Sequence, residues 1–505
     1  MLVVVGAAGA GAILLATRPG IGLYSDSTYY LSLARRLLSG NGYTLIAIDG
    51  KVDPVARYPF VYPTILAVPG LFRFDLLAGA RWIGAIIFFA HILLMGSIIY
   101  RASARSVGAA VLCAVLTCAS YDTLSYHSIA LSDAPFLLFI LFGFAMMARH
   151  LDSPSWISLL CSAAATGLAL AIRYAGAAFV IAGCAAILAW GRGSLLRRAR
   201  DAVLFGWFSS LLMVSWILRN MRYGLGATGR HLAFHPAVGG AQIKDLVFAF
   251  SSWASNGTRT AAELYLRGPI VVGLLFALVI AAAWLSIKRF ETDLQLALPL
   301  LYFLSYTAVL ILTSVFLQAD LFLDSLRILM PLHVFALIQA LIVGNRLYRR
   351  IQSRVQRAVA VALCVLLCAC FLRWAAQWIE DMSEDGQGYA SSTYTDSEML
   401  QAVRDLPPGS RFYSNLPWPI GIYTDRTWSL LPTKIDIATL EENRVYREQL
   451  QKFTELMKQP GIYLAIYNQG DNWYSFPTLD EIRALLPLRV VVQTEDGIIY
   501  AAVNQ

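Results

Sequence analysis

Long apolar stretches alternate with short polar loops over most of the chain. A helix needs about 20 mostly apolar residues to cross the hydrocarbon core of a bilayer. The first apolar stretch is short, but it lacks a basic n-region and an Ala-x-Ala cleavage site, so we expect it to be retained as a span. We predict eleven membrane-spanning helices, at residues 2–17, 82–100, 106–120, 131–148, 155–172, 174–190, 202–219, 268–287, 295–316, 327–345 and 358–378.

The composition fits a polytopic membrane protein. Hydrophobic residues make up 58% of the chain and charged residues only 14%, against about 25% charged in typical soluble domains. The net charge of +8 does not indicate a nucleic-acid partner, because the basic residues lie in short clusters between apolar runs. All seven cysteines lie in apolar runs, and no Cys/His spacing resembles a zinc site. We therefore expect neither a metal nor a cofactor.

The loop charges predict the orientation of the spans. The short loops at 121–130 and 317–326 contain no Lys or Arg, whereas alternate loops are basic. Basic loops face the cytoplasm. An odd number of spans then puts the C-terminus outside. The predicted cytoplasmic loops carry Arg101, Arg105, Arg149, Arg192, Arg197, Arg198, Arg200, Lys288, Arg289, Arg346, Arg349, Arg350, Arg354 and Arg357.

Three long polar stretches share the predicted outer face, at residues 18–81, 220–267 and 379–505. We divide the chain into an all-α transmembrane module, 1–378, and a soluble extracytoplasmic α/β domain, 379–505. The middle stretch is rich in glycine and is interpreted as a flexible lid or wall.

The first polar stretch has structure of its own. Helical spacing predicts a helix from Ser27 to Ser39, and Asp49-Gly50 predicts a hairpin turn. Residues 60–72 are apolar but too short to span a membrane. In the C-terminal domain, helices are predicted at 397–405 and 440–458 and strands at 411–414, 462–467, 490–494 and 498–503.

Asp26 stands between hydroxyl and aromatic residues in the segment from Tyr24 to Tyr30. One interpretation is a helix N-cap, since Asp and Ser are preferred there. The capping-box partner is absent, because the residues three positions after Asp26 and Ser27 are tyrosines. The other interpretation is a functional carboxylate, and the two are compatible.

Asp133 raises the same question at the start of a predicted span. It precedes Pro135, as an N-cap residue would, but it also lies near the predicted outer surface, where a carboxylate is available for chemistry. We expect Asp122, by contrast, to be a solvated loop residue.

Four arginines stand at predicted outer span ends. A charge this close to hydrocarbon is costly unless it is paired or reaches water. One interpretation is that the side chains extend to lipid headgroups. The other is that they bind a lipid-linked phosphate, which a guanidinium group matches bidentately. The residues are Arg57, Arg173, Arg219 and Arg327.

A carboxylate and several arginines on the outer face suit transfer of a sugar from a lipid phosphate. The carboxylate can take the proton of an attacking hydroxyl, and fixed cations stabilise a departing phosphate. The sequence contains no Walker A loop and no Rossmann glycine fingerprint, which agrees with a donor that arrives without a nucleotide.

Several short motifs follow one another in a characteristic order along the first six spans, with one late addition. Their order and spacing resemble those of the motifs in the GT-C glycosyltransferases. The resemblance is greatest to the bacterial group related to protein O-mannosyltransferases and the aminoarabinose transferase of lipid A. The motifs are Asp26-Ser27-Thr28-Tyr29-Tyr30 followed by residues 34–43, Arg57-Tyr58-Pro59-Phe60-Val61-Tyr62-Pro63, Ala130-Leu131-Ser132-Asp133-Ala134-Pro135, Arg173-Tyr174-Ala175-Gly176, and Arg327 with Pro331.

The resemblance implies roles for individual residues. The family's essential acidic residue in the first outer loop falls on Asp26, and the acidic residue that opens the fourth span falls on Asp133. The basic residue that contacts the donor phosphate falls on Arg57. Many relatives carry an acidic pair where this chain has Ser27 beside Asp26, which weakens a metal role. The remaining candidates for substrate binding are Tyr29, Tyr58, His127, Arg173 and Arg327.

We therefore expect an inverting glycosyltransferase in the inner (cytoplasmic) membrane, in contact with membrane lipids, with its active site and C-terminal domain outside. It would move a sugar from a polyprenyl-phosphate donor to a glycan, glycolipid or protein acceptor for the cell envelope. One alternative is a transporter or flippase of lipid-linked sugars, although we find no inverted repeats of the kind that transporters show. Another is a non-catalytic assembly scaffold, which the presence of Asp26 and Asp133 disfavours.

Overall fold

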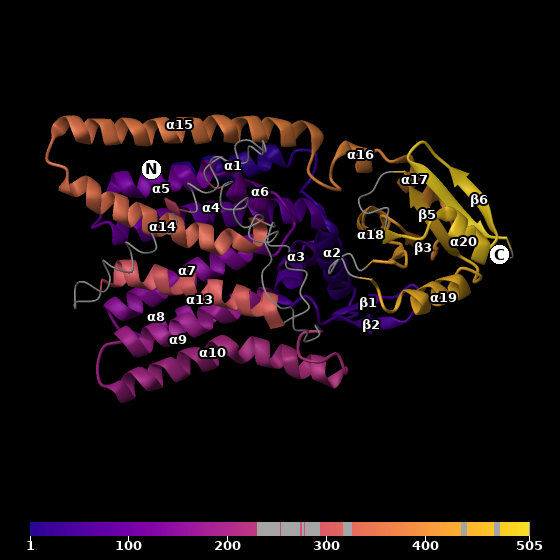
Figure 1. The fold of residues 1–505 in the computed structure, drawn as a ribbon, viewed down its shortest axis with the longest axis horizontal. Helices are drawn as coiled ribbons and strands as arrows, with labels where there is room; N and C mark the ends of the chain where they lie inside the picture. Colours follow the sequence, from indigo (N-terminus) through magenta and orange to yellow (C-terminus); the bar gives the residue numbers. More distant parts are fainter. Residues whose placement is uncertain are drawn as a thin grey trace. The chain divides into compact units, whose positions relative to one another are not determined.

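A computed structural model (Figure 1) describes residues 1–229, 253, 273–274, 277, 293–316, 326–435, 442–468 and 475–503 of the chain. The chain divides into two compact units, and each is built from segments that are distant in sequence. Unit 1 contains residues 1–18, 56–62 and 80–384, and unit 2 contains residues 19–55, 63–79 and 385–505.

Unit 1 is a bundle of helices that run side by side (Figure 1). Helix α7 packs against α8, α8 packs against α10, and α13 packs against both α9 and α14. The helices of the bundle are α1 (Leu2–Ala16), α4 (Leu76–Ala102), α5 (Val107–Ala119), α6 (Tyr121–His127), α7 (Asp133–Asp152), α8 (Trp156–Ile172), η1 (Tyr174–Gly176), α9 (Ala177–Trp190), α10 (Leu195–Arg222), α13 (Leu294–Phe316), α14 (Leu326–Arg350) and α15 (Arg354–Asp385).

Six of these helices are long and apolar enough to cross a membrane: α4, α7, α10, α13, α14 and α15. The pair α5 and α6 meets at a 60° bend and gives a seventh candidate if it counts as one span. Three further apolar helices of the bundle, α1, α8 and α9, are shorter than 18 residues. A helix rises about 1.5 Å per residue, so these cross less than the full hydrocarbon thickness. Each predicted span in the described residues overlaps a helix, but the count of eleven is not confirmed.

Some sequence predictions lie outside the described part of the chain. They are the span at 268–287, most of the polar stretch at 220–267 and the loop from residue 317.

Aromatic rings fill the centre of unit 1. Phe179 of α9 stacks on Tyr306 of α13, with ring centroids 5.5 Å apart. Phe144 of α7 meets Tyr302 edge-on at 5.2 Å. A lipid environment supplies little hydrophobic drive between helices, so close packing of this kind holds a membrane bundle together. Helix α15 is different from these packed helices. Only 6% of its apolar segment is buried in the protein, as expected for a helix that faces lipid.

Unit 2 contains a five-stranded mixed sheet in the order β4-β3-β5-β7-β6. Strand β3 runs parallel to both β4 and β5, whereas β7 runs antiparallel to β5 and β6. The strands are β3 (Arg411–Ser414), β4 (Thr427–Leu430), β5 (Ile462–Tyr467), β6 (Leu488–Gln493) and β7 (Gly497–Ala502). Four of them are the predicted strands within two residues, and β4 was not predicted.

Short helices accompany the sheet. They are α16 (Ser392–Thr395), α17 (Glu398–Asp405), α18 (Trp418–Tyr423), α19 (Tyr446–Leu456) and α20 (Leu479–Leu485). Helix α17 confirms the helix predicted at 397–405, and α19 falls within the one predicted at 440–458.

The first polar stretch contributes most of its length to unit 2, as α2 (Ser25–Leu38), β1 (Thr44–Ile46), β2 (Val52–Pro54) and α3 (Val61–Leu71). Strands β1 and β2 form the predicted hairpin, and Gly50 adopts the φ of +84° that its turn requires. Arg35 donates to the carbonyl oxygens of Gly421 at 2.9 Å and Ile422 at 2.7 Å. The domain boundary predicted at residues 378 and 379 falls inside α15 and stays a prediction.

The apolar core of the sheet can be tested at Phe453 of α19. Its ring is fully buried and meets Tyr413 edge-on at 4.8 Å. We expect Phe453→Ala to cost about 3–5 kcal/mol through lost burial and a residual cavity. The control is Leu485→Ala, because Leu485 is exposed. Thermal unfolding and trypsin sensitivity of the full chain in detergent are the measurements. Equal midpoints for the two variants would contradict this core.

Candidate functional site

Asp133 is the first residue of α7, and its carboxylate is held by two arginines. Ser132 occupies the N-cap position, so Asp133 is not the helix cap that one interpretation of the sequence expected. Arg173 Nη1 binds Oδ1 of Asp133, and Arg327 Nε binds Oδ2 at 2.9 Å. The Asp133 side chain is only 6% exposed. The cluster formed by these three residues is called the Arg–Asp–Arg cluster below.

Three different elements place the cluster. Arg173 is the C-cap of α8, where an extended backbone breaks the helix before η1. Arg327 lies in the first turn of α14. The two arginine side chains remain 21% and 23% exposed. Two guanidinium groups around one carboxylate leave a formal charge of +1, and a charge in these partly dry surroundings acts more strongly than one in bulk water.

A small crevice lies over the cluster. Its apolar and aromatic walls are formed by Phe136, Leu137, Tyr306, Met330 and Pro331. The Tyr306 hydroxyl donates to the carbonyl oxygen of Ile328 at 2.9 Å, which fixes its ring at the edge of the crevice. The cluster therefore places its charged groups beside an apolar wall.

The segment around Arg57 is anchored through Tyr174, the neighbour of Arg173. The Tyr174 hydroxyl donates to the carbonyl oxygen of Ala56 at 2.8 Å and accepts from Trp216 Nε1 at 3.0 Å. Phe60 packs on Trp216, with ring centroids 5.5 Å apart. Arg57 itself is exposed, and its guanidinium carbon lies 5.9 Å from the centroid of the Tyr58 ring. The structure thus joins the Arg57 segment to the cluster through one tyrosine.

Tyr174 and Trp216 were not singled out from the sequence as site residues. Trp216 lies within an apolar run and resembles ordinary core there. The sequence signal for Tyr174 was its position next to Arg173, but only Arg173 was predicted to be a site residue. The guanidinium carbon of Arg219, the fourth arginine at a predicted outer span end, lies 4.8 Å from the Trp216 ring centroid and 4.9 Å from that of Tyr223.

Asp26 is half-buried in the first turn of α2, in unit 2. The helix begins at Ser25 with Tyr24 as N-cap, two residues earlier than predicted, so the interpretation of Asp26 as the N-cap residue is wrong. Ser27 takes part in the capping instead, because its Oγ accepts from the backbone N–H of Tyr24 at 3.1 Å. A carboxylate in the first turn is stabilised by the helix dipole. Nearby, Tyr29 meets Trp428 edge-on at 5.2 Å.

His127 lies in the interior of unit 1 and does not line the crevice over the cluster. Its Nε2 is 3.2 Å from Nδ1 of the equally buried His91, and its Nδ1 is 2.6 Å from the carbonyl oxygen of Thr123. Asp122, expected to be solvated, is only 2% exposed, and its Oδ2 lies 3.7 Å from His333 Nδ1. That expectation was wrong, because the predicted loop continues as helix α6 and turns its polar residues inward.

Among the residues that the structure describes, no three His, Cys, Asp or Glu side chains are grouped as metal ligands would be.

The chain has the GT-C fold, that of membrane glycosyltransferases. Its structure is similar to crystal structures of ArnT from Cupriavidus metallidurans. The apo form shares 13% identity and a TM-score of 0.58, over 99% of this chain and 98% of that one. The form bound to undecaprenyl phosphate shares 14% identity and a TM-score of 0.58, over 99% and 97%. No protein-family model and no curated protein sequence matches the chain.

Two further solved structures are similar. The mycobacterial arabinofuranosyltransferase AftD shares 16% identity and a TM-score of 0.55, over all of this chain and 40% of AftD. The archaeal oligosaccharyltransferase AglB from Archaeoglobus fulgidus, solved with an inhibitory peptide and a dolichol-phosphate, shares 11% identity and a TM-score of 0.52. That match covers 92% of this chain and 69% of AglB.

The cluster can be tested by removing its carboxylate. Asp133→Ala leaves two partly buried guanidinium groups without their shared partner, and we expect a loss of about 3 kcal/mol. Replacing Arg173 by Gln in the same chain should recover part of that loss. Asp152→Ala, at the other end of α7 and 82% exposed, should change stability by less than about 0.5 kcal/mol. The midpoint of thermal unfolding in detergent is the measurement, and equal shifts for Asp133→Ala and Asp152→Ala would contradict the pairing.

Proposed function

We propose that the chain is an inverting glycosyltransferase that moves a sugar from a polyprenyl-phosphate donor to a hydroxyl of an extracytoplasmic acceptor. The acceptor is a glycan, a glycolipid or a protein of the cell envelope. The enzyme sits in the cytoplasmic membrane among its lipids, with its site and C-terminal domain on the outer side. The observation that carries the proposal is the fold match along the whole chain with a protein crystallised with undecaprenyl phosphate.

The Arg–Asp–Arg cluster supports the donor half of this proposal. Its formal charge of +1 lies beside the apolar residues of the crevice. A lipid phosphate presents anionic oxygens and an apolar chain, and the cluster combines cationic and apolar groups at one end of the bundle, which supports a donor phosphate nearby. Because Asp133 holds both arginines, we assign it the role of positioning them. This role is favoured over direct contact between Asp133 and the acceptor.

Arg57 is the proposed direct ligand of the donor phosphate. It is exposed, while the residues around it are fixed through Tyr174 and Trp216. An exposed guanidinium on a fixed segment can reach a ligand without a large loss of conformational freedom. Tyr58 lies beside it and is a candidate to contact the sugar.

Asp26 is the proposed general base. The proton of the acceptor hydroxyl passes to its carboxylate as the acceptor oxygen bonds to the anomeric carbon. The bond between that carbon and the phosphate oxygen breaks, and its electron pair leaves with the polyprenyl phosphate. Attack opposite the leaving group inverts the anomeric centre. Arginines then stabilise the charge that develops on the departing phosphate.

The base is tested by Asp26→Asn, which keeps the size of the side chain but removes its basicity. We expect transfer to fall by about 100-fold to 10,000-fold, while the free energy of unfolding falls by no more than about 1 kcal/mol through the lost interaction with the helix dipole. Asp75→Asn is the matched control, because Asp75 is a carboxylate of unit 2 directly before α4 and accepts from the backbone N–H of Ala78 at 2.8 Å. Product formation by the reconstituted enzyme is the measurement.

The outcomes separate the enzyme from its rival. Near-normal turnover in Asp26→Asn would end the assignment of the base. Movement of labelled lipid-linked sugar between leaflets, without any product, would favour a flippase instead.

Arg57 has a test of its own, because it belongs to unit 1, whereas Asp26 belongs to unit 2. We expect Arg57→Gln to lower kcat/KM for the lipid donor by about tenfold or more, the value of a charge-assisted hydrogen bond. Arg18→Gln removes an exposed arginine from the same predicted face and the same unit and should leave kcat/KM unchanged. The same loss in both variants would mean that only general surface charge attracts the donor.

A further inference from the structure

A second cavity lies in unit 1, at the ends of the helices that the loop charges predict to be cytoplasmic. It has a volume of about 830 Å³, within the range of about 300–1,000 Å³ that is typical of ligand sites. Helices α4, α7, α13 and α14 surround it. Arg149 lies 16 residues after Asp133 in α7, which places the cavity roughly 24 Å from the Arg–Asp–Arg cluster at about 1.5 Å per residue. It is therefore separate from the proposed donor site.

The charges of this cavity are unbalanced. Four arginines and two aspartates line it: Arg101, Arg105, Arg149, Arg346, Asp152 and Asp293. Both carboxylates already have a cation, because Arg346 pairs with Asp293, and Arg192, from outside the cavity, lies 3.8 Å from Asp152. Within the described residues, the guanidinium groups of Arg101, Arg105 and Arg149 make no ion pair or hydrogen bond. These three arginines therefore line the cavity without a counter-ion among the described residues.

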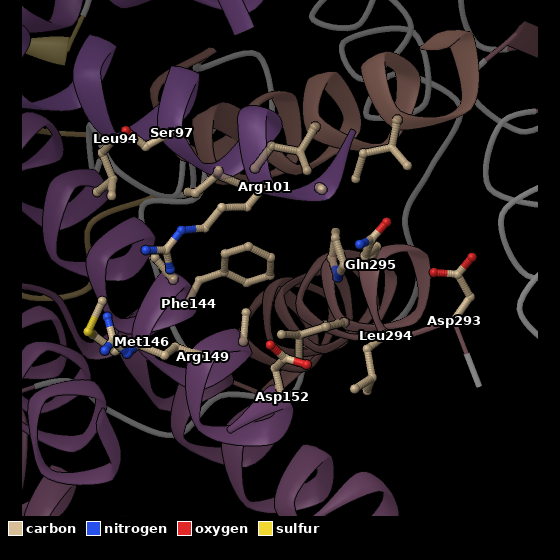
Figure 2. Close-up of a pocket in the computed structure, with 18 of the residues that line it drawn as sticks. Leu94, Ser97, Arg101, Phe144, Met146, Arg149, Asp152, Asp293, Leu294 and Gln295 are labelled. Carbon is tan, nitrogen blue, oxygen red and sulfur yellow. The ribbon is translucent and has the colours of Figure 1, made fainter. Parts of the chain in front are cut away.

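The deeper wall of the cavity is apolar. It is formed by residues such as Leu94, Ile98, Leu298, Ile338 and Ile342. Figure 2 shows Arg101 reaching from α4 toward Phe144 and Arg149 of α7, whereas Asp293 and Gln295 lie on the other side of the view. A ligand that filled this space would meet cations at one end and hydrocarbon along its length.

We propose that this cavity binds the phosphate headgroup of an anionic membrane lipid, with an acyl chain against the apolar wall. Guanidinium groups match phosphate oxygens in geometry and charge, and anionic lipids are concentrated in the cytoplasmic leaflet. A soluble phosphate would use the same cations but would leave the apolar wall exposed to water. The occupied carboxylates explain why the three arginines remain available for the lipid.

The test uses the full chain in vesicles and compares two double variants. Arg101→Gln with Arg149→Gln removes two of the cavity's cations. Arg350→Gln with Arg354→Gln removes two exposed arginines from the same predicted face that do not line the cavity. Retained lipid is counted by native mass spectrometry after solubilisation from phosphatidylcholine vesicles with and without phosphatidylglycerol.

At about a fivefold loss of affinity per arginine, the cavity variant should bind phosphatidylglycerol roughly 25-fold more weakly. The control pair should stay within about twofold, because lipid that exposed charges attract only diffusely is not retained after solubilisation. Lysine in place of Arg149 should recover part of the binding. Unfolding midpoints in pure phosphatidylcholine should be similar, because the side chains of neither pair make an ion pair or a hydrogen bond with the described residues.

Three results would overturn the proposal. They are an equal loss in both double variants, equal retention of phosphatidylcholine and phosphatidylglycerol, and stabilisation by inorganic phosphate alone to the level that phosphatidylglycerol gives. The last result would assign the cations to a soluble anion instead of a lipid.

Discussion

Asp133 pairs with both Arg173 and Arg327, and one end of unit 1 depends on this double ion pair. Each guanidinium alone would be costly at the edge of a hydrocarbon layer. Together with one carboxylate they tie the start of α7 to the end of α8 and the start of α14. The same three residues therefore join three helices and concentrate charge at one end of the bundle.

Much of the helical fold could be predicted, since a helix exposed to lipid needs a continuous apolar sequence and satisfies its own backbone. The bend between α5 and α6 could not. Asp122 and His127 looked like loop residues, because the buried partners that accommodate them, His333 and His91, come from other helices. Strand β4 was missed for a related reason: it is four residues long and only half-buried along its length.

The candidate site was predictable in its parts but not in its connections. Charges at predicted outer span ends could be identified one by one as Asp133, Arg173 and Arg327. Their pairing joins residues 40 and 194 positions apart, and no local pattern records such distances. Likewise, Tyr174 acquires its importance only when Ala56 and Trp216 meet at its hydroxyl. The helix start at Ser25, which places Asp26 in the first turn, depends on a hydroxyl that accepts a backbone N–H three residues back.

The composition of unit 2 has a consequence for biosynthesis. Arg35 of helix α2 binds carbonyl groups that lie 386 and 387 residues further along the chain. Those partners are made only after every helix of unit 1. Contacts of such long range cost loop-closure entropy and form late. Unit 2 is therefore completed only after the helices of unit 1 have been synthesised, and until then the segment that carries Asp26 lacks its native neighbours.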